Sequence, residues 1–174
     1  MSKFIMSVRK LLGGILLFIG FLIVILGYGI AFAANLPDHT STPGALNPAV
    51  NQANIKTTIC VPNYTSTIRP KPSYTTKLKL KQLRTVGAYA STLGASSFEE
   101  DHLISLEIGG NPTSEQNLWP QHWSAPFGAH QKDQLENKLH RLVCSGTITL
   151  VEAQQSIASN WIAAYQKYIT GGVK

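Results

Sequence analysis

A turn between two β-prone segments, followed by a helical pattern, constrains the fold of this chain most strongly. Apolar residues at alternate positions of His102–Ile108 share one side of a predicted strand. Gly109-Gly110-Asn111-Pro112 must turn the chain, and Asn117–Trp119 is the predicted return segment, with pairing expected to stop near Pro120. Leucines at helical spacing predict a helix over Ala129–Val143. The order β-β-α indicates an α+β fold.

An additional helix is predicted at the C-terminal end. Thr149 and Glu152 have the spacing of a capping box, and apolar residues recur at helical spacing up to Tyr168. We interpret the aromatic residues of this stripe as packing surface. Closer to the N-terminus, Tyr74–Leu83 is predicted as a short helix and Tyr64–Ile68 as a short strand.

The first 34 residues have the pattern of an export signal. Basic residues precede Leu11–Ala34, a run of 24 residues without charge that ends in Ala31-Phe32-Ala33. The small-residue ending predicts a peptidase site, while the length of the run also suits a membrane span. Residues 1–34 are therefore expected to be a cleaved signal peptide or a signal anchor. Either way the remainder is expected outside the cytoplasm, either secreted or periplasmic, or anchored to the membrane through residues 11–34.

The rest of the chain divides by composition. Residues 35–57 are rich in Pro, Asn, Thr and Ser and lack apolar periodicity, which predicts a disordered tether. A folded domain is then expected over residues 58–170. Without residues 1–34 the formal net charge falls from +6 to +3, so net charge alone points weakly to an anionic partner.

Two cysteines, Cys60 and Cys144, lie in the region expected to be exported. Thiols in such compartments tend to oxidise, so a disulfide between them is expected, with two buried free thiols as the alternative. No Cys-x-x-Cys pair is present, which disfavours a structural zinc site of the paired-knuckle type.

Asp101 and His102 supply the groups that phosphodiester hydrolysis requires. The negative charge of a phosphodiester repels nucleophiles, and a divalent cation offsets that charge. An imidazole that titrates near neutral pH can deprotonate the attacking water. Because neighbours on a regular strand face opposite sides, Asp101 and His102 can share one cation only at a strand end or a bulge.

The ordered set Asp101-His102, Gly109-Gly110 and Asn117-Leu118 resembles the HNH, or ββα-metal, nuclease superfamily. Small exported bacterial HNH-like proteins are similar over a wider set of short segments, namely Thr67-Ile68-Arg69-Pro70, Tyr74-Thr75, Asn117-Leu118-Trp119-Pro120-Gln121, Lys132-Asp133, Leu135-Glu136 and Ala153-Gln154. The resemblance implies a ββα-metal core with an additional C-terminal helix. It also implies His102 as the general base, Asp101 as a ligand of one divalent metal ion (Mg²⁺, Mn²⁺ or Zn²⁺), and Asn117 as an amide that positions the loop and the base.

The resemblance implies a second metal ligand from the helix. His130 stands in the first helical turn, where family members carry His or Asn, and Glu136 is the alternative, with Asp133 as a third candidate. The chain departs from the family in four ways. His130 lies two residues before Lys132 rather than three, and Ser105 stands where the family has Pro. The gap from Asn117 to the helix is longer than in the family, and the zinc-knuckle cysteines are missing.

Basic residues cluster in a stretch without acids between Asp38 and Glu99. Such a cluster can neutralise phosphates, although an ordinary solvated face has the same composition. The residues expected to bind nucleic acid are Arg69, Lys77, Lys79, Lys81, Arg84 and, nearest the expected cation, Lys132. Trp119 and Trp123 are interpreted as packing residues, with stacking on bases as the alternative.

These patterns predict an exported, metal-dependent HNH-like endonuclease with little sequence preference. It is expected to act on DNA rather than RNA, by water attack that His102 activates. The competing hypothesis is an exported module without catalysis that uses the same scaffold and basic segment to bind nucleic acid or another polyanion.

Overall fold

The computed structural model describes residues 36–84, 87–124 and 126–172 of the 174-residue chain. The predicted export segment, residues 1–34, lies outside these ranges. Within them, no helix has both the length and the apolar character needed to cross a bilayer. The helices and strands, in chain order, are α2 Tyr64–Ile68, α3 Pro72–Arg84, β1 Phe98–His102, β2 Leu118–His122, α4 Ala129–Ser145 and α5 Leu150–Tyr165.

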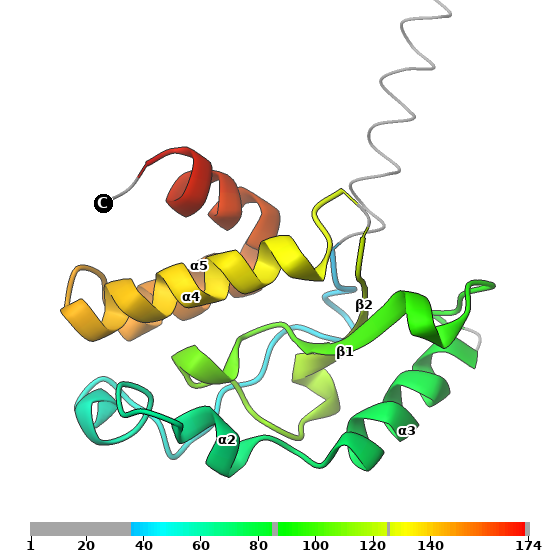
Figure 1. The fold of residues 1–174 in the computed structure, drawn as a ribbon, viewed down its shortest axis with the longest axis horizontal. Helices are drawn as coiled ribbons and strands as arrows, with labels where there is room; N and C mark the ends of the chain where they lie inside the picture. Colours follow the sequence, from blue (N-terminus) through cyan, green and yellow to red (C-terminus); the bar gives the residue numbers. More distant parts are fainter. Residues whose placement is uncertain (1–35, 85–86, 125, 173–174) are drawn as a thin grey trace, which may run out of the picture. The chain divides into compact units, whose positions relative to one another are not determined.

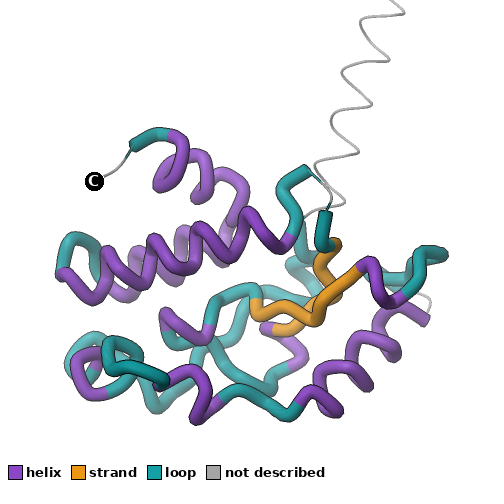
Figure 2. The backbone as a smooth tube through the Cα atoms, viewed as in Figure 1, coloured by secondary structure: helices purple, strands orange, loops and turns teal. Residues whose placement is uncertain are grey.

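The fold is α+β, as predicted. A two-stranded antiparallel hairpin of β1 and β2 packs against helices, with α3 on one side and the α4–α5 pair on the other (Figure 1). Loops, drawn teal in Figure 2, connect these elements, and several contain short 3-10 turns. The hairpin therefore lies in the middle layer, between two helical layers.

Strand β1 lies four residues earlier than predicted. The predicted strand His102–Ile108 begins where β1 ends, and Leu106–Ile108 is a 3-10 turn that Ser105 caps by accepting the Glu107 N–H at 3.2 Å. The prediction is wrong because the alternation reflects apolar residues of an irregular loop, and even Leu103, on its expected outer side, is fully buried. Pairing also continues past Pro120, which lies opposite Glu100. A proline is tolerated here because both strands of a two-stranded sheet are edges.

The two glycines of the turn are required for different reasons. Gly109 has a φ of +78°, a left-handed conformation that side chains disfavour. At Gly110 a Cβ would lie 1.7 Å from the carbonyl oxygen of Ile104, a distance that no side chain could occupy. The Gly-Gly pair therefore allows the loop between the strands to fold back onto itself.

Helices α4 and α5 form most of the hydrophobic core, as their apolar stripes predicted. The core cluster comprises mainly their buried residues and those of the loop after β1, including Ile104, Ile108, Leu135, Leu139, Ala153, Ile157 and Trp161. Thr149 caps α5 by accepting the Glu152 N–H at 3.1 Å, and Gly146 ends α4 with a φ of +79°. The predicted Cys60–Cys144 disulfide is present, with Cα atoms 5.6 Å apart.

Two other segments differ from prediction. Tyr64–Ile68 is the single-turn helix α2 rather than a strand, because it has no neighbouring strand and the hydroxyls of Ser66 and Thr67 donate to carbonyls three residues back. The predicted helix Tyr74–Leu83 is confirmed within α3.

The prediction of a disordered tether is wrong for residues 36–57. The Gly44 N–H donates to the Gln116 carbonyl at 2.9 Å, the Asn47 N–H donates to the Gly109 carbonyl at 2.9 Å, and Val50 is buried in the core. The segment has no apolar periodicity because backbone hydrogen bonds to the β1–β2 loop, rather than a repeating apolar face, hold it in place.

Candidate active site

The side chains of Asp101 and His102 lie on opposite faces of the hairpin. The β1–β2 ladder is regular here, with Asp101 opposite Trp119 and His102 opposite Leu118. His102 lines a cleft on the α3 side, whereas Asp101 contacts Lys132 of α4. The two residues therefore do not share a pocket, and the expected convergence on one cation does not occur.

A buried ion cluster lies on the α4 side of β1. The Lys132 ammonium is 2.7 Å from Asp101 Oδ2, donates to the His102 carbonyl at 2.7 Å, and also pairs with the Glu136 carboxylate one helical turn along α4. Lys132 is fully buried, with 0% of its surface exposed. The prediction that Lys132 binds phosphate is therefore wrong, because no ligand can reach its ammonium.

The electrostatics of this cluster favour a charged lysine. Burial by itself lowers the pKa of Lys132, but the carboxylates of Asp101 and Glu136 outweigh burial and raise it above its ordinary value. The same burial raises the pKa of Glu136 and of Asp101, and the ammonium opposes that effect. The cluster therefore depends on its ammonium to keep two carboxylates buried together.

The predicted helix ligands are dispersed. His130 is exposed, and its ring lies 5.5 Å from that of Trp123, with the two ring planes tilted by 37°. Glu136 belongs to the lysine cluster, and Asp133 is exposed on α4. In the described ranges, the single group of three metal-ligating side chains with ligand atoms within 4.8 Å of one another is Cys60, His140 and Cys144, and its cysteines are joined as a disulfide.

These residues do not fit the divalent metal ion that the sequence resemblance implies. Asp101 and Glu136, two of the carboxylates expected to bind the metal ion, form ion pairs with Lys132. A cation placed between them would lie against the ammonium, and the two positive charges would repel each other. Because His130 is turned away on the surface, it does not complete a ligand set with Asp101.

The tautomer of His102 follows from its one hydrogen bond. Its Nε2 lies 2.9 Å from the carbonyl oxygen of Pro112, and a carbonyl can only accept, so Nε2 carries the proton. In a neutral ring Nδ1 then keeps an available lone pair, and no group among the described residues bonds to it. Burial lowers the pKa of His102 to about 4, so the ring is neutral at physiological pH. A fixed neutral imidazole of this kind can accept a proton.

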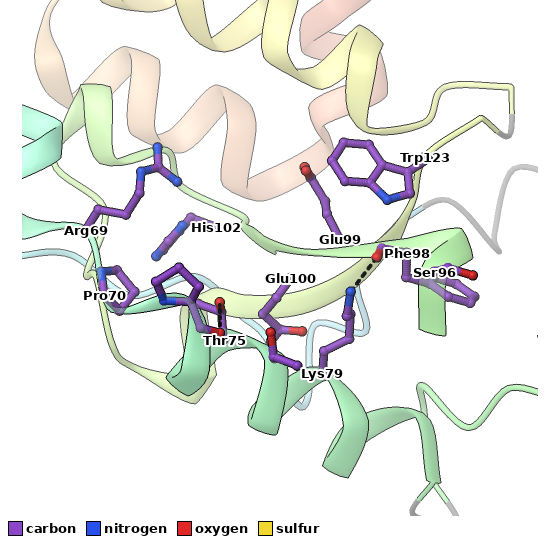
Figure 3. Close-up of a pocket in the computed structure, with 12 residues that line it drawn as sticks. Arg69, Pro70, Thr75, Lys79, Ser96, Phe98, Glu99, Glu100, His102 and Trp123 are labelled. Atoms are coloured by element: carbon purple, nitrogen blue, oxygen red, sulfur yellow. Dashed lines mark hydrogen bonds between the residues drawn. The ribbon is translucent and has the colours of Figure 1, made fainter. Parts of the chain in front are cut away.

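His102 lines a cleft of about 600 Å³ between β1 and α3 (Figure 3). Arg69, from the loop before α3, lies beside the His102 ring, and Lys79 lies further along the cleft, where it donates to the Phe98 carbonyl at 2.7 Å. No carboxylate of the described residues forms an ion pair with Arg69. The cleft thus combines an imidazole base with two cationic side chains.

Glu100 is a cleft residue that the sequence did not single out. It precedes His102 by two residues and therefore shares its face of β1, and both of its carboxylate oxygens are buried without a hydrogen-bond partner. Burial, and next the charge of Asp101, raise the pKa of Glu100 to about 8. Glu99 has a pKa of about 8 for the same two leading causes. The i, i+2 spacing to His102 could have identified Glu100 had β1 been placed correctly.

Asn117 is buried behind the cleft and holds the β1–β2 loop. Its Nδ2 donates to the carbonyls of Ile104 and Asn111, both at 3.0 Å, and its Oδ1 accepts the Ile104 N–H at 2.9 Å. These bonds fix the segment that carries Pro112, the partner of His102. The geometry is that of a positioning amide rather than a group that touches substrate.

The remaining predicted contacts divide between the cleft and the surface. Arg69 and Lys79 line the cleft, whereas Lys77, Lys81 and Arg84 are exposed on α3, and Lys81 pairs with Glu115 at 2.9 Å. Trp119 is buried as a packing residue, while Trp123 lines the cleft.

Comparison of the chain with protein-family models, with curated proteins and with solved structures finds no match. The functional interpretation therefore depends on the motifs and on the geometry of the cleft.

Proposed function

We propose that this protein is an exported endonuclease that hydrolyses phosphodiester bonds of DNA, with His102 as general base. The observation that carries the proposal is the hydrogen bond from His102 Nε2 to Pro112, which fixes the neutral tautomer in a cationic cleft. The HNH resemblance of the Asp-His, Gly-Gly and Asn-Leu motifs supports this assignment. The Cys60–Cys144 disulfide supports export, because such bonds persist in oxidising compartments.

Four side chains of the cleft have roles in the proposed reaction. His102 Nδ1 takes a proton from water as the water oxygen bonds to phosphorus and the bond from phosphorus to the leaving oxygen breaks. The guanidinium of Arg69 and the ammonium of Lys79 offset the charge that develops on the phosphoryl oxygens. The Glu100 carboxyl, protonated at neutral pH, gives a proton to the leaving oxygen.

The test is a plasmid-nicking assay of His102→Ala and His102→Asn. Asparagine keeps a donor for the Pro112 carbonyl but has no basic nitrogen, so both variants should lose about 10²- to 10⁴-fold in rate. His39→Ala, which changes an exposed histidine outside the cleft, is the matched control and should cleave like the wild type. Cleavage by a folded His102→Asn chain at the wild-type rate would contradict the proposal.

A second candidate is a module that binds polyanions without cleaving them. The observation in its favour is the Lys132 cluster, which leaves the carboxylates expected to hold a metal ion engaged with an ammonium. This candidate predicts DNA binding by the wild type that depends on Arg69, with no nicking under any cation.

A further inference from the structure

Three oxygen atoms surround the ammonium of Lys132. They are Asp101 Oδ2 and the His102 carbonyl oxygen, each at 2.7 Å, and Glu136 Oε1. Carboxylate and carbonyl oxygens are the ligands that Mg²⁺ and Mn²⁺ prefer. The ammonium donates hydrogen bonds to the His102 carbonyl and to Glu136, and Asp101 Oδ2 lies at ion-pair distance.

The cluster also links β1 to α4, because two of its members come from each element. Asp101 and His102 are consecutive on β1, and Lys132 and Glu136 are one turn apart on α4. The Lys132 side chain is 1% exposed and that of Asp101 10%, so water and ions have little access. The ammonium therefore links the strand to the helix as a bound cation would, from inside the protein.

We infer that Lys132 takes the structural place of the divalent cation, and that cleavage in the His102 cleft proceeds without a bound metal ion. This inference rests on the proposed function. The ammonium cannot touch substrate, because it lies on the buried face of β1 while the cleft lies on the other. The positive charge that a phosphodiester requires comes instead from Arg69 and Lys79, which line the cleft beside His102 and Glu100.

A metal-binding measurement tests whether Lys132 takes the place of the cation, and it does not require that the protein cleave DNA. Binding of Mn²⁺ to the full chain is measured by electron paramagnetic resonance for the wild type, Lys132→Ala and the control Lys138→Ala on the same helix. The wild type and Lys138→Ala should bind no stoichiometric Mn²⁺. Lys132→Ala leaves three oxygens around an empty space, so it should bind Mn²⁺ stoichiometrically and gain thermal stability with it. A folded Lys132→Ala chain that binds no Mn²⁺ overturns the substitution.

A cleavage assay tests whether the reaction proceeds without a bound metal ion. The wild-type chain is assayed on plasmid in EDTA and in Mg²⁺, Mn²⁺ or Zn²⁺, and nicking in EDTA should match nicking with each cation. Nicking that requires a divalent cation overturns metal independence. An absence of nicking in every condition counts against the proposed function, while the Mn²⁺ measurement still decides whether Lys132 occupies the cation's place.

The wild type keeps the inference testable if Lys132→Ala does not fold. In that case Mn²⁺ binding is compared between the wild type and Asp101→Asn. Stoichiometric Mn²⁺ binding by the wild type that Asp101→Asn abolishes overturns the inference, and no binding by either chain supports it.

Discussion

The two faces of β1 carry the same kinds of charged residue and use them differently. On the α4 face, Asp101 is buried in an ion pair with the Lys132 ammonium, which also donates to the His102 carbonyl and pairs with Glu136. On the α3 face, Glu100 and His102 line an open cleft, and the Glu100 oxygens have no partner. A strand that alternates its side chains thus separates a buried ion cluster from the proposed active-site cleft at consecutive residues.

This difference teaches that adjacency in sequence does not make a shared site. Asp101 and His102 are consecutive, but the ladder places their side chains on opposite faces. They are linked through the backbone, because the carbonyl of His102 accepts from the lysine that Asp101 binds. Changes on the α4 face are therefore expected to alter stability, and changes on the α3 face to alter activity or pH dependence.

The largest effect is expected from Lys132→Ala. Removing the ammonium leaves the Asp101 and Glu136 carboxylates buried without a counter-ion, which should lower the free energy of unfolding by about 3–5 kcal/mol. Urea denaturation in metal-free buffer measures it. Lys138→Ala, a lysine of the same helix outside the cluster, should change the value by no more than about 0.5 kcal/mol. Equal effects of the two substitutions would show that the buried ion cluster does not stabilise the fold.

A smaller loss is expected from Asp101→Asn. The amide keeps the size of the side chain but removes one of the two carboxylates that pair with the Lys132 ammonium. The free energy of unfolding should therefore fall by about 1–3 kcal/mol. Chemical denaturation at neutral pH provides the measurement. The same chemical change at the preceding residue, Glu100→Gln, should not destabilise the fold at that pH, because it removes a carboxyl that has no hydrogen-bond partner.

Glu100→Gln should instead change how stability depends on pH. The folded-state pKa of Glu100 is about 8, above its unfolded value of 4.5, so its contribution is complete below the unfolded pKa and is lost as pH rises through about 8. Glutamine cannot ionise, so the melting temperature of the variant should increasingly exceed that of the wild type from about pH 5 to about pH 9. Parallel melting curves across this range would show that Glu100 does not titrate in the cleft.

The smallest effect is expected from Arg69→Ala. Loss of one phosphate contact should weaken DNA binding and reduce the slope of log affinity against log salt concentration by about one. Fluorescence anisotropy over a salt series gives the slope. Arg141→Ala removes an exposed arginine of α4 that does not line the cleft and should leave the slope unchanged. An unchanged slope for Arg69→Ala would place the anionic ligand elsewhere.

The sequence predicted the elements whose signals are local. The stripe of α4 and the Thr149 cap of α5 were identified because periodicity and capping depend on neighbouring residues. The position of β1 was not, because its acidic residues have no strand pattern while the irregular loop after it has one by coincidence. Residues 36–57 were misassigned because they are held by backbone bonds to a distant loop.

The motifs proposed candidate residues, but they did not predict how the fold arranges them. The motifs pointed to His102 and Asn117, whose observed hydrogen bonds fit a base and a positioning amide. The role of Lys132 was not predictable, because a lysine four residues before a glutamate is the usual pattern of an exposed helical pair. Its burial depends on how α4 packs against β1, and the spacing of residues along the sequence does not predict that packing.

The backbone pairing of residues 44–47 with the β1–β2 loop limits how the N-terminal part of the chain can be processed. Gly44, Ala45 and Asn47 supply backbone partners to Gln116, Asn111 and Gly109, within the loop that also carries Pro112. Proteolytic trimming that stops before these residues preserves the loop. Trimming that removes them would leave the loop that carries Pro112 without these backbone hydrogen bonds, so a chain cut after Asn47 is expected to lose support for the cleft.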